Sequence, residues 1–261
     1  IVAGLATYKV AGITPVVVDP ETTSLILNTT FKYDSSATTE TNSSLVTLVT
    51  NTLTTYNTDN LSQFDGIFRL SKVQRLIDDT NTAILSNITS VTMANKITPT
   101  LNAATSYSSS FNNAFYYPYS GYNKAAGGII ASTGFKIQGD TVNTMFFDDD
   151  GEGNLRMYYL VSGARVYKDS KVGTVDYAKG TIKTVSLIIT DISDVDGATS
   201  TTIRVTAIPD SKDIVPVRNQ LIEIDFVNTI ITGEVDTIAV SDASAGSTYQ
   251  TTSTVTSTSS Y

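Results

Sequence analysis

The sequence contains no cysteine and no histidine. The absence of cysteine excludes disulfides and thiolate chemistry, and the absence of histidine removes imidazole catalysis and most transition-metal ligation. Ser-His-Asp, Cys-His and zinc-dependent hydrolysis are therefore excluded within this chain. The chemistry that remains uses carboxylate pairs, lysine, tyrosine, or a hard cation held by Asp and Glu.

Charged side chains are also scarce. Asp, Glu, Lys and Arg make up 16% of the 261 residues, and the net charge is −8. Lysine and arginine are scattered singly, so the chain lacks the cluster of cations that neutralises a phosphate backbone. No apolar run approaches the roughly 20 residues of a membrane-spanning helix. The sequence therefore predicts neither a nucleic-acid partner nor a membrane partner.

Thr, Ser and Asn take the place of the missing charges along the whole chain. Threonine favours strands. A weakly charged surface also carries few groups that resist association. The composition is typical of a β-rich protein that other subunits cover.

The first part of the chain has alternating strand and helix patterns. Residues 16–18 predict a short strand before an Asp-Pro turn, and alternate apolar residues over 25–33 predict a second strand. A helix capped within residues 41–43 should follow, because apolar residues then recur at helical spacing. Its predicted buried face consists of Leu45, Leu48, Val49, Leu53 and Tyr56.

Residues 61–68 predict a short helical stretch that breaks around Gly66. Ser71 is placed to cap a further helix, whose apolar residues are Val73, Leu76 and Ile77. A strand is predicted over 89–97. The order of strand, strand, helix, helix and strand indicates helices that cover one face of a sheet.

From residue 101 onward the pattern changes to short strands separated by Gly, Asp and Asn. The clearest hairpin joins residues 173–177 to 181–189, with Gly180 supplying a positive φ at the turn. Further strands are predicted at 129–130, 135–137, 145–147, 155–160, 163–167, 201–208 and 220–226.

These patterns together predict an α+β fold in three consecutive parts. Residues 1–100 form an α+β domain, residues 101–235 form a β-rich domain of antiparallel hairpins, and residues 236–261 form a Ser/Thr-rich polar arm. The arm has too few large apolar residues to bury itself, so we expect it to lie along another surface.

The densest group of oxygen ligands is the segment Asp148, Asp149, Asp150, Gly151 and Glu152. It resembles part of a calcium loop, but it lacks the EF-hand spacing and the closing Glu. The segment also lies between two predicted strands, where Asp and Gly are ordinary turn residues. The calcium and turn interpretations both stay open, and no cofactor is predicted.

Two other groups suggest alternative functions. The aromatic residues over 111–122 could stack on a glycan, which would indicate a virion-surface or secreted adhesin, although aromatic clusters more often pack in a core or an interface. Glu223 and Asp225, or Asp78 and Asp79, could form a glycosidase pair, but surface carboxylates are common. The aromatic residues are Phe111, Phe115, Tyr116, Tyr117, Tyr119 and Tyr122.

Four stretches, taken together and in order, resemble the carboxyl-terminal part of the baseplate wedge subunit of T-even-like contractile-tailed phages, within the broader baseplate J-like family. They are Thr38 to Tyr56 (TTETNSSLVTLVTNTLTTY), Phe64 to Asp79 (FDGIFRLSKVQRLIDD), Gly173 to Ile182 (GTVDYAKGTI) and Ile203 to Asp225 (IRVTAIPDSKDIVPVRNQLIEID).

The resemblance implies a non-enzymatic structural protein of the virion. Copies would form dimers, the dimers would close a ring around the central hub beneath the sheath, and other wedge and hub proteins would be partners. Assembly is expected in the host bacterial cytoplasm. Arg69, Arg75 and Arg218 lie within the resembling stretches and are candidate interface anchors, because arginine is enriched at interfaces. The chain starts at Ile1, so we expect a longer or processed polypeptide.

Overall fold

The computed structural model describes residues 21–122, 124, 128–195 and 197–237. Strands account for 49% and helices for 14%, which confirms the predicted α+β fold with a β-rich second part. The described residues divide into two compact units. The larger unit contains residues up to 27, 54–70 and 90–230, and the smaller unit contains 28–53, 71–89 and 231 onward.

These units interleave segments that are far apart in the sequence. The sequence instead predicted the consecutive parts 1–100, 101–235 and 236–261, and that division stays a prediction. The expected strand at 16–18 and the polar arm beyond 237 lie outside the described residues.

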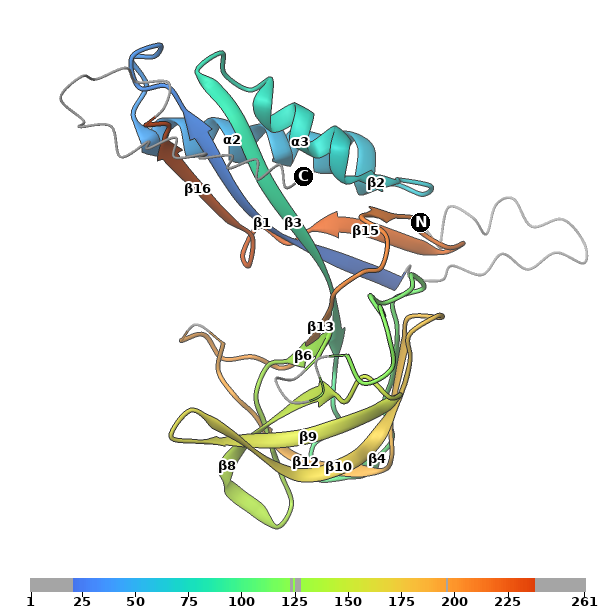
Figure 1. The fold of residues 1–261 in the computed structure, drawn as a ribbon. Helices are drawn as coiled ribbons and strands as arrows, with labels where there is room; N and C mark the ends of the chain where they lie inside the picture. Colours follow the sequence, from blue (N-terminus) through green and yellow to red (C-terminus); the bar gives the residue numbers. More distant parts are fainter. Residues whose placement is uncertain (1–20, 123, 125–127, 196, 238–261) are drawn as a thin grey trace, which may run out of the picture. The chain divides into compact units, whose positions relative to one another are not determined.

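The smaller unit is a helix-covered sheet (Figure 1). Strand β1 (Glu21–Tyr33) has β3 (Ile84–Ile97) and β16 (Ile230–Val235) as neighbours. Helices α2 (Asn42–Tyr56) and α3 (Leu70–Asp78) lie beside these strands. Both helices and the last strand of the first part were predicted, and β3 begins five residues earlier than the pattern indicated.

The alternation in β1 explains its orientation. Leu27, Thr29, Phe31 and Tyr33 are buried on one face, as the period-two pattern predicted. Thr29 also makes a buried hydrogen bond with Thr89 of β3, at 3.2 Å between the hydroxyl oxygens. The strand thus buries its alternate apolar residues, and the buried Thr29 hydroxyl finds its partner on a neighbouring strand.

Side-chain hydrogen bonds attach the two helices to the sheet. Asn42, at the start of α2, donates from Nδ2 to the carbonyl of Gly233 in β16 at 2.9 Å. Asn87 of β3 donates to the carbonyl of Gln74 at 2.8 Å and to the Asp78 carboxylate at 2.7 Å. Both helix contacts therefore use polar side chains that sequence periodicity does not reveal.

The chain remains helical beyond Tyr56, the last residue of α2. It continues as a π-helical turn, η2 (Asn57–Leu61), and the chain then bends into the short strand β2 (Phe68–Arg69). The predicted helical stretch over 61–68 is therefore wrong. A Cβ atom on Gly66 would lie 2.5 Å from the Leu61 carbonyl oxygen, so the chain folds back closely on η2 there.

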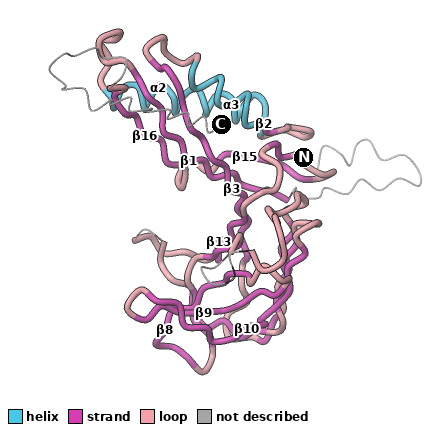
Figure 2. The backbone as a smooth tube through the Cα atoms, viewed as in Figure 1, coloured by secondary structure: helices cyan, strands magenta, loops and turns pink. Residues whose placement is uncertain are grey.

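The larger unit is built from antiparallel strands (Figure 2). Strands run in the order β13-β6-β8-β9-β10-β11-β5 along the main sheet, and β12 joins β4 and β7 beside it. The bounds are β4 (Ala104–Thr105), β5 (Ser108–Ser110), β6 (Ile130–Ser132), β7 (Phe135–Ile137), β8 (Asp140–Asp149), β9 (Asn154–Val161), β10 (Ala164–Asp176), β11 (Thr181–Thr184), β12 (Leu187–Ile192), β13 (Ile203–Ala207), β14 (Asp213–Ile214) and β15 (Gln220–Ile224).

The predicted hairpin is confirmed as β10 and β11, with Gly173 opposite Thr184 and Asp176 opposite Thr181. Gly180 has a φ of 63° at the turn, as the sequence indicated. The second strand is shorter than predicted, because β11 ends at Thr184 and β12 starts at Leu187.

The pairing of β15 with β1 departs from the antiparallel pattern. Strand β15 runs parallel to the first residues of β1, with Glu21 opposite Gln220 and Leu25 opposite Ile224. The segments are nearly 200 positions apart in the sequence, so no local pattern could predict this contact. Among the described residues, no helix is both long and apolar enough to span a membrane.

Candidate functional site

The acidic segment that resembled a calcium loop is buried. Asp148 and Asp149 end β8, and Asp150 begins the turn into β9. Their exposed fractions are 1%, 0% and 6%. Gly151 and Gly153 have φ values of 69° and 94°, which allow the tight turn. Three buried carboxylates are costly unless each of them receives hydrogen bonds.

Asp148 is the counter-ion of two arginines. Arg156, directly opposite it on β9, donates from Nε at 2.9 Å and from Nη2 at 3.2 Å. Arg165 donates at 2.8 Å and the Tyr167 hydroxyl at 3.0 Å, both from β10. Burial raises the pKa of Asp148, and the Arg156 hydrogen bond opposes that shift.

The same arginines also stack on tyrosine rings. The Arg156 guanidinium lies 4.3 Å from the ring centroid of Tyr167, and Arg165 lies 4.7 Å from that of Tyr158. Such cation–π contacts add to the ion pairs. Strands β8, β9 and β10 are therefore joined by a charged and aromatic cluster centred on Asp148.

Asp149 binds three donors from separate segments. Its carboxylate accepts hydrogen bonds from the Tyr177 hydroxyl at 2.6 Å, the Ile130 amide at 3.0 Å and the Gly151 amide at 3.3 Å. Burial and the Asp149 carboxylate raise the pKa of Tyr177 far above its usual value. A Cβ on Gly128 would lie 1.6 Å from Asp149 Oδ1, so only glycine fits beside this carboxylate.

Asp150 stabilises its own turn. It accepts hydrogen bonds from the Glu152 amide at 2.7 Å, the Asn154 amide at 3.0 Å and the Asn154 side chain at 2.6 Å. Glu152 pairs with Lys124 at 2.8 Å. Within the described ranges, no group of three or more acidic residues is arranged to hold a metal ion. The geometry favours a structural network, and calcium binding stays an untested alternative.

The aromatic cluster divides into core and surface residues. Phe111 and Phe115 are buried and meet edge to face at 5.2 Å. Tyr117 stacks on Tyr177, with ring centroids 4.5 Å apart, so one face of its ring is covered. Tyr119 is 62% exposed. The Gly121 amide donates to the Gly151 carbonyl in the β8–β9 turn at 2.7 Å. These contacts favour packing of the 116–122 loop rather than an open glycan platform.

The carboxylates of the glycosidase alternative serve local structure. Asp78 accepts the Asn87 hydrogen bond that ties α3 to β3. Glu223, on β15, accepts a hydrogen bond from Ser24 at 3.4 Å. Asp225 accepts hydrogen bonds from the turn that follows β15. These contacts favour a structural use of each group.

The three candidate interface arginines are all on the surface. Arg69 pairs with Asp213 at 2.9 Å, where β2 meets β14. Arg75 pairs with Asp79 one helical turn away at 3.2 Å and has an 83% exposed side chain. Arg218 is exposed, and no ion pair joins it to another described residue. Exposed pairs of this kind contribute little to stability, so these residues are available for contacts with other chains.

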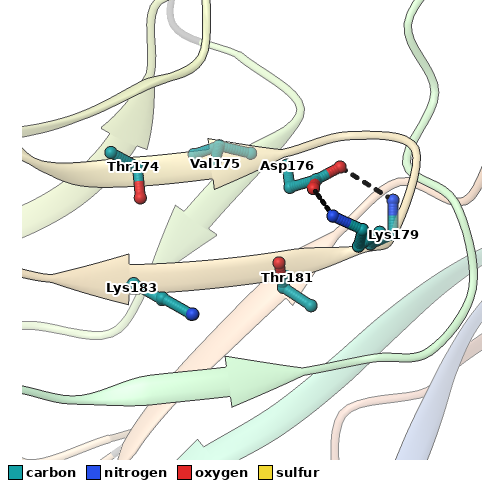
Figure 3. A pocket seen from close by; sticks show the side chains of 6 residues that line it. All are labelled: Thr174, Val175, Asp176, Lys179, Thr181 and Lys183. Carbon is teal, nitrogen blue, oxygen red and sulfur yellow. Dashed lines mark hydrogen bonds and ion pairs between the residues drawn. The ribbon is translucent and has the colours of Figure 1, made fainter.

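The hairpin β10–β11 carries a shallow cleft of ≈ 290 Å³ (Figure 3). Lys179 closes the turn through two contacts with Asp176, at 3.0 Å from its amide and 3.0 Å from its ammonium group. Thr174, Thr181 and Lys183 line the rest of one side. The cleft is an open surface of the hairpin, and its one carboxylate, Asp176, is paired with Lys179.

Residues 23–96 match the family described as "Baseplate structural protein gp6, C-terminal domain III", a phage baseplate wedge family. The match covers less than a third of the chain and spans most of β1, both helices and nearly all of β3. Two of the four resembling stretches lie inside it, and those over 173–182 and 203–225 lie outside. No curated protein matches the chain. The family match supports a structural role in a phage tail baseplate.

Proposed function

We propose that the chain is a non-enzymatic, late-expressed wedge subunit of a contractile-tail baseplate. Copies would pair as homodimers and join into an inner ring that surrounds the hub and supports the sheath. The match of residues 23–96 to a baseplate structural domain carries this proposal. Its work would be mechanical: to hold the ring before contraction and let subunit contacts shift during contraction.

Exposed apolar side chains support a protein that other chains cover. Within the matched range, Phe64 is 65% exposed and Ile88 is 78% exposed. Outside it, Val142 and Val227 are 86% and 88% exposed. Each such side chain gains free energy when a partner removes it from water. The partners would be a second copy and other wedge and hub proteins, assembled in the host bacterial cytoplasm and located in the virion.

Light scattering over a concentration series tests self-association. We expect a dimer or a larger species whose fraction rises with concentration. Replacing Arg75 by Ala should weaken self-association about tenfold, because interface arginines often contribute more than about 1 kcal/mol. Lys72→Ala, which removes another exposed cation from α3, is the matched control and should leave the association constant unchanged.

A mass that stays monomeric at every concentration would contradict the homodimer. An association constant that Arg75→Ala leaves unchanged would exclude Arg75 from the interface while leaving the dimer in place. The two parts of the proposal therefore fail separately.

A further inference from the structure

A polar cleft of ≈ 220 Å³ in the larger unit is lined by two cationic side chains. Lys96 of β3 and Arg204 of β13 line it, together with Thr202, Asp225 and Asn228. Every lining residue belongs to the same compact unit. The sequence analysis did not find this cleft, because its two cations are 108 positions apart in the chain.

The two cations are directly opposite each other. In the antiparallel pairing of β13 with β3, Arg204 is the register partner of Lys96. Residues paired in this way point to the same face of the sheet, and like charges there repel each other. Among the described residues, no ion pair within 4.0 Å joins either cation to a carboxylate. The cleft is therefore lined by two cations and one carboxylate, that of Asp225, in a chain whose net charge is −8.

The Arg204 guanidinium is held in position from one side. Its Nη1 donates a hydrogen bond to Oδ1 of the Asn228 side chain. The side-chain Nδ2 of Asn228 in turn donates to the Asp225 carboxylate at 2.6 Å. Asp225 also accepts hydrogen bonds from the amides of Val227 and Asn228, at 3.1 and 3.2 Å. Asp225 therefore stabilises its turn and orients Asn228, and Arg204 keeps further N–H donors for a ligand.

We propose that Lys96 and Arg204 form a binding site for an oxyanion, a phosphate or a carboxylate group. A planar guanidinium binds both groups through paired N–H donors, and a lysine ammonium adds a mobile positive charge. A bound oxyanion would also relieve the repulsion between the two cations. The source would be free phosphate or a carboxylate of another protein. This proposal does not depend on the baseplate role.

Amide NMR shifts of the whole chain, titrated with sodium phosphate and with sodium acetate at constant ionic strength, test the site. We expect saturable shifts centred on Lys96, Arg204 and Asn228 with at least one of the two salts. Lys96→Gln should weaken binding about tenfold, because it removes one charged donor. Lys183→Gln, an exposed lysine on β11 with the same change in charge, is the matched control and should bind as the unchanged protein does.

A thermal measurement checks the repulsion independently. At low salt and without added oxyanion, Lys96→Gln should raise the melting temperature relative to Lys183→Gln, because it removes one of two opposed like charges. Saturating phosphate or acetate should reverse that order, because the intact site of Lys183→Gln binds more tightly and gains more stability.

Binding of phosphate but not acetate would assign the site to a free oxyanion, and the opposite preference would assign it to a protein carboxylate. The proposal is overturned if neither salt causes saturable shifts at these amides. It is also overturned if Lys96→Gln and Lys183→Gln bind equally well.

Discussion

Replacing Asp148 by Ala is expected to lower the free energy of unfolding by about 3–5 kcal/mol, because the change leaves a buried arginine without its counter-ion. The Arg156 side chain is 8% exposed, and both of its contacts to the Asp148 carboxylate would be lost. Arg165 and Tyr167 would lose the same acceptor. Urea unfolding followed by circular dichroism measures the change.

Asp213→Ala is the matched control for this prediction. It also removes one aspartate from an Arg–Asp pair at 2.9 Å, but the side chains of Arg69 and Asp213 are 57% and 41% exposed. Water replaces an exposed partner, so the expected loss is about 0–1 kcal/mol. A loss below about 1 kcal/mol for Asp148→Ala as well would contradict the structural role assigned to the buried cluster.

Replacing Gly180 by Ala is expected to destabilise the β10–β11 hairpin by roughly 2–4 kcal/mol, through two separate effects. The φ of 63° disfavours any residue with a Cβ. In addition, the new Cβ would lie 1.9 Å from the backbone carbonyl oxygen of Asn113, which no side-chain rotation can relieve. The Phe111 amide, which donates to the Gly180 carbonyl at 2.9 Å, would be displaced too.

Gly163→Ala isolates the first of these effects. Gly163 has a φ of 82°, and no atom lies within 4 Å of the position that its Cβ would take. The cost there should be the backbone term alone, about 1–2 kcal/mol. If Gly180→Ala and Gly163→Ala lower the free energy of unfolding by the same amount in thermal or urea unfolding, the result would contradict a close approach of Asn113 to the turn.

Local patterns predicted the elements well where one face of a strand or helix is buried. The alternation over 25–33 and the apolar spacing over 45–56 correspond to buried faces in β1 and α2, except that Leu48, which was predicted to be buried, is 36% exposed. The helical prediction over 61–68 failed, because Leu61 is buried at the end of the π-helical turn η2 and Phe68 is buried in the short strand β2, so the two do not share one helix face. Spacing of apolar residues cannot distinguish these two arrangements.

The candidate site was predicted less well, because its chemistry depends on long-range partners. The sequence identified Asp148 and Asp149 as possible oxygen ligands of a cation. A turn rich in Asp and Gly has the same residue types whether or not it binds a cation. Their donors include Arg165 and Tyr177, which come from β10 and the turn that follows it. Only the strand register shows that these groups meet.

The most direct test of the central claim, that the chain is a structural subunit of a phage tail baseplate, is its location in the virion. Gold-labelled antibodies raised against the purified chain would be applied to intact particles of the encoding phage and to their isolated tails, then viewed by electron microscopy. The account predicts label at the end of the tail farthest from the head in both preparations. Label on the capsid, or particles that lack the chain, would contradict it.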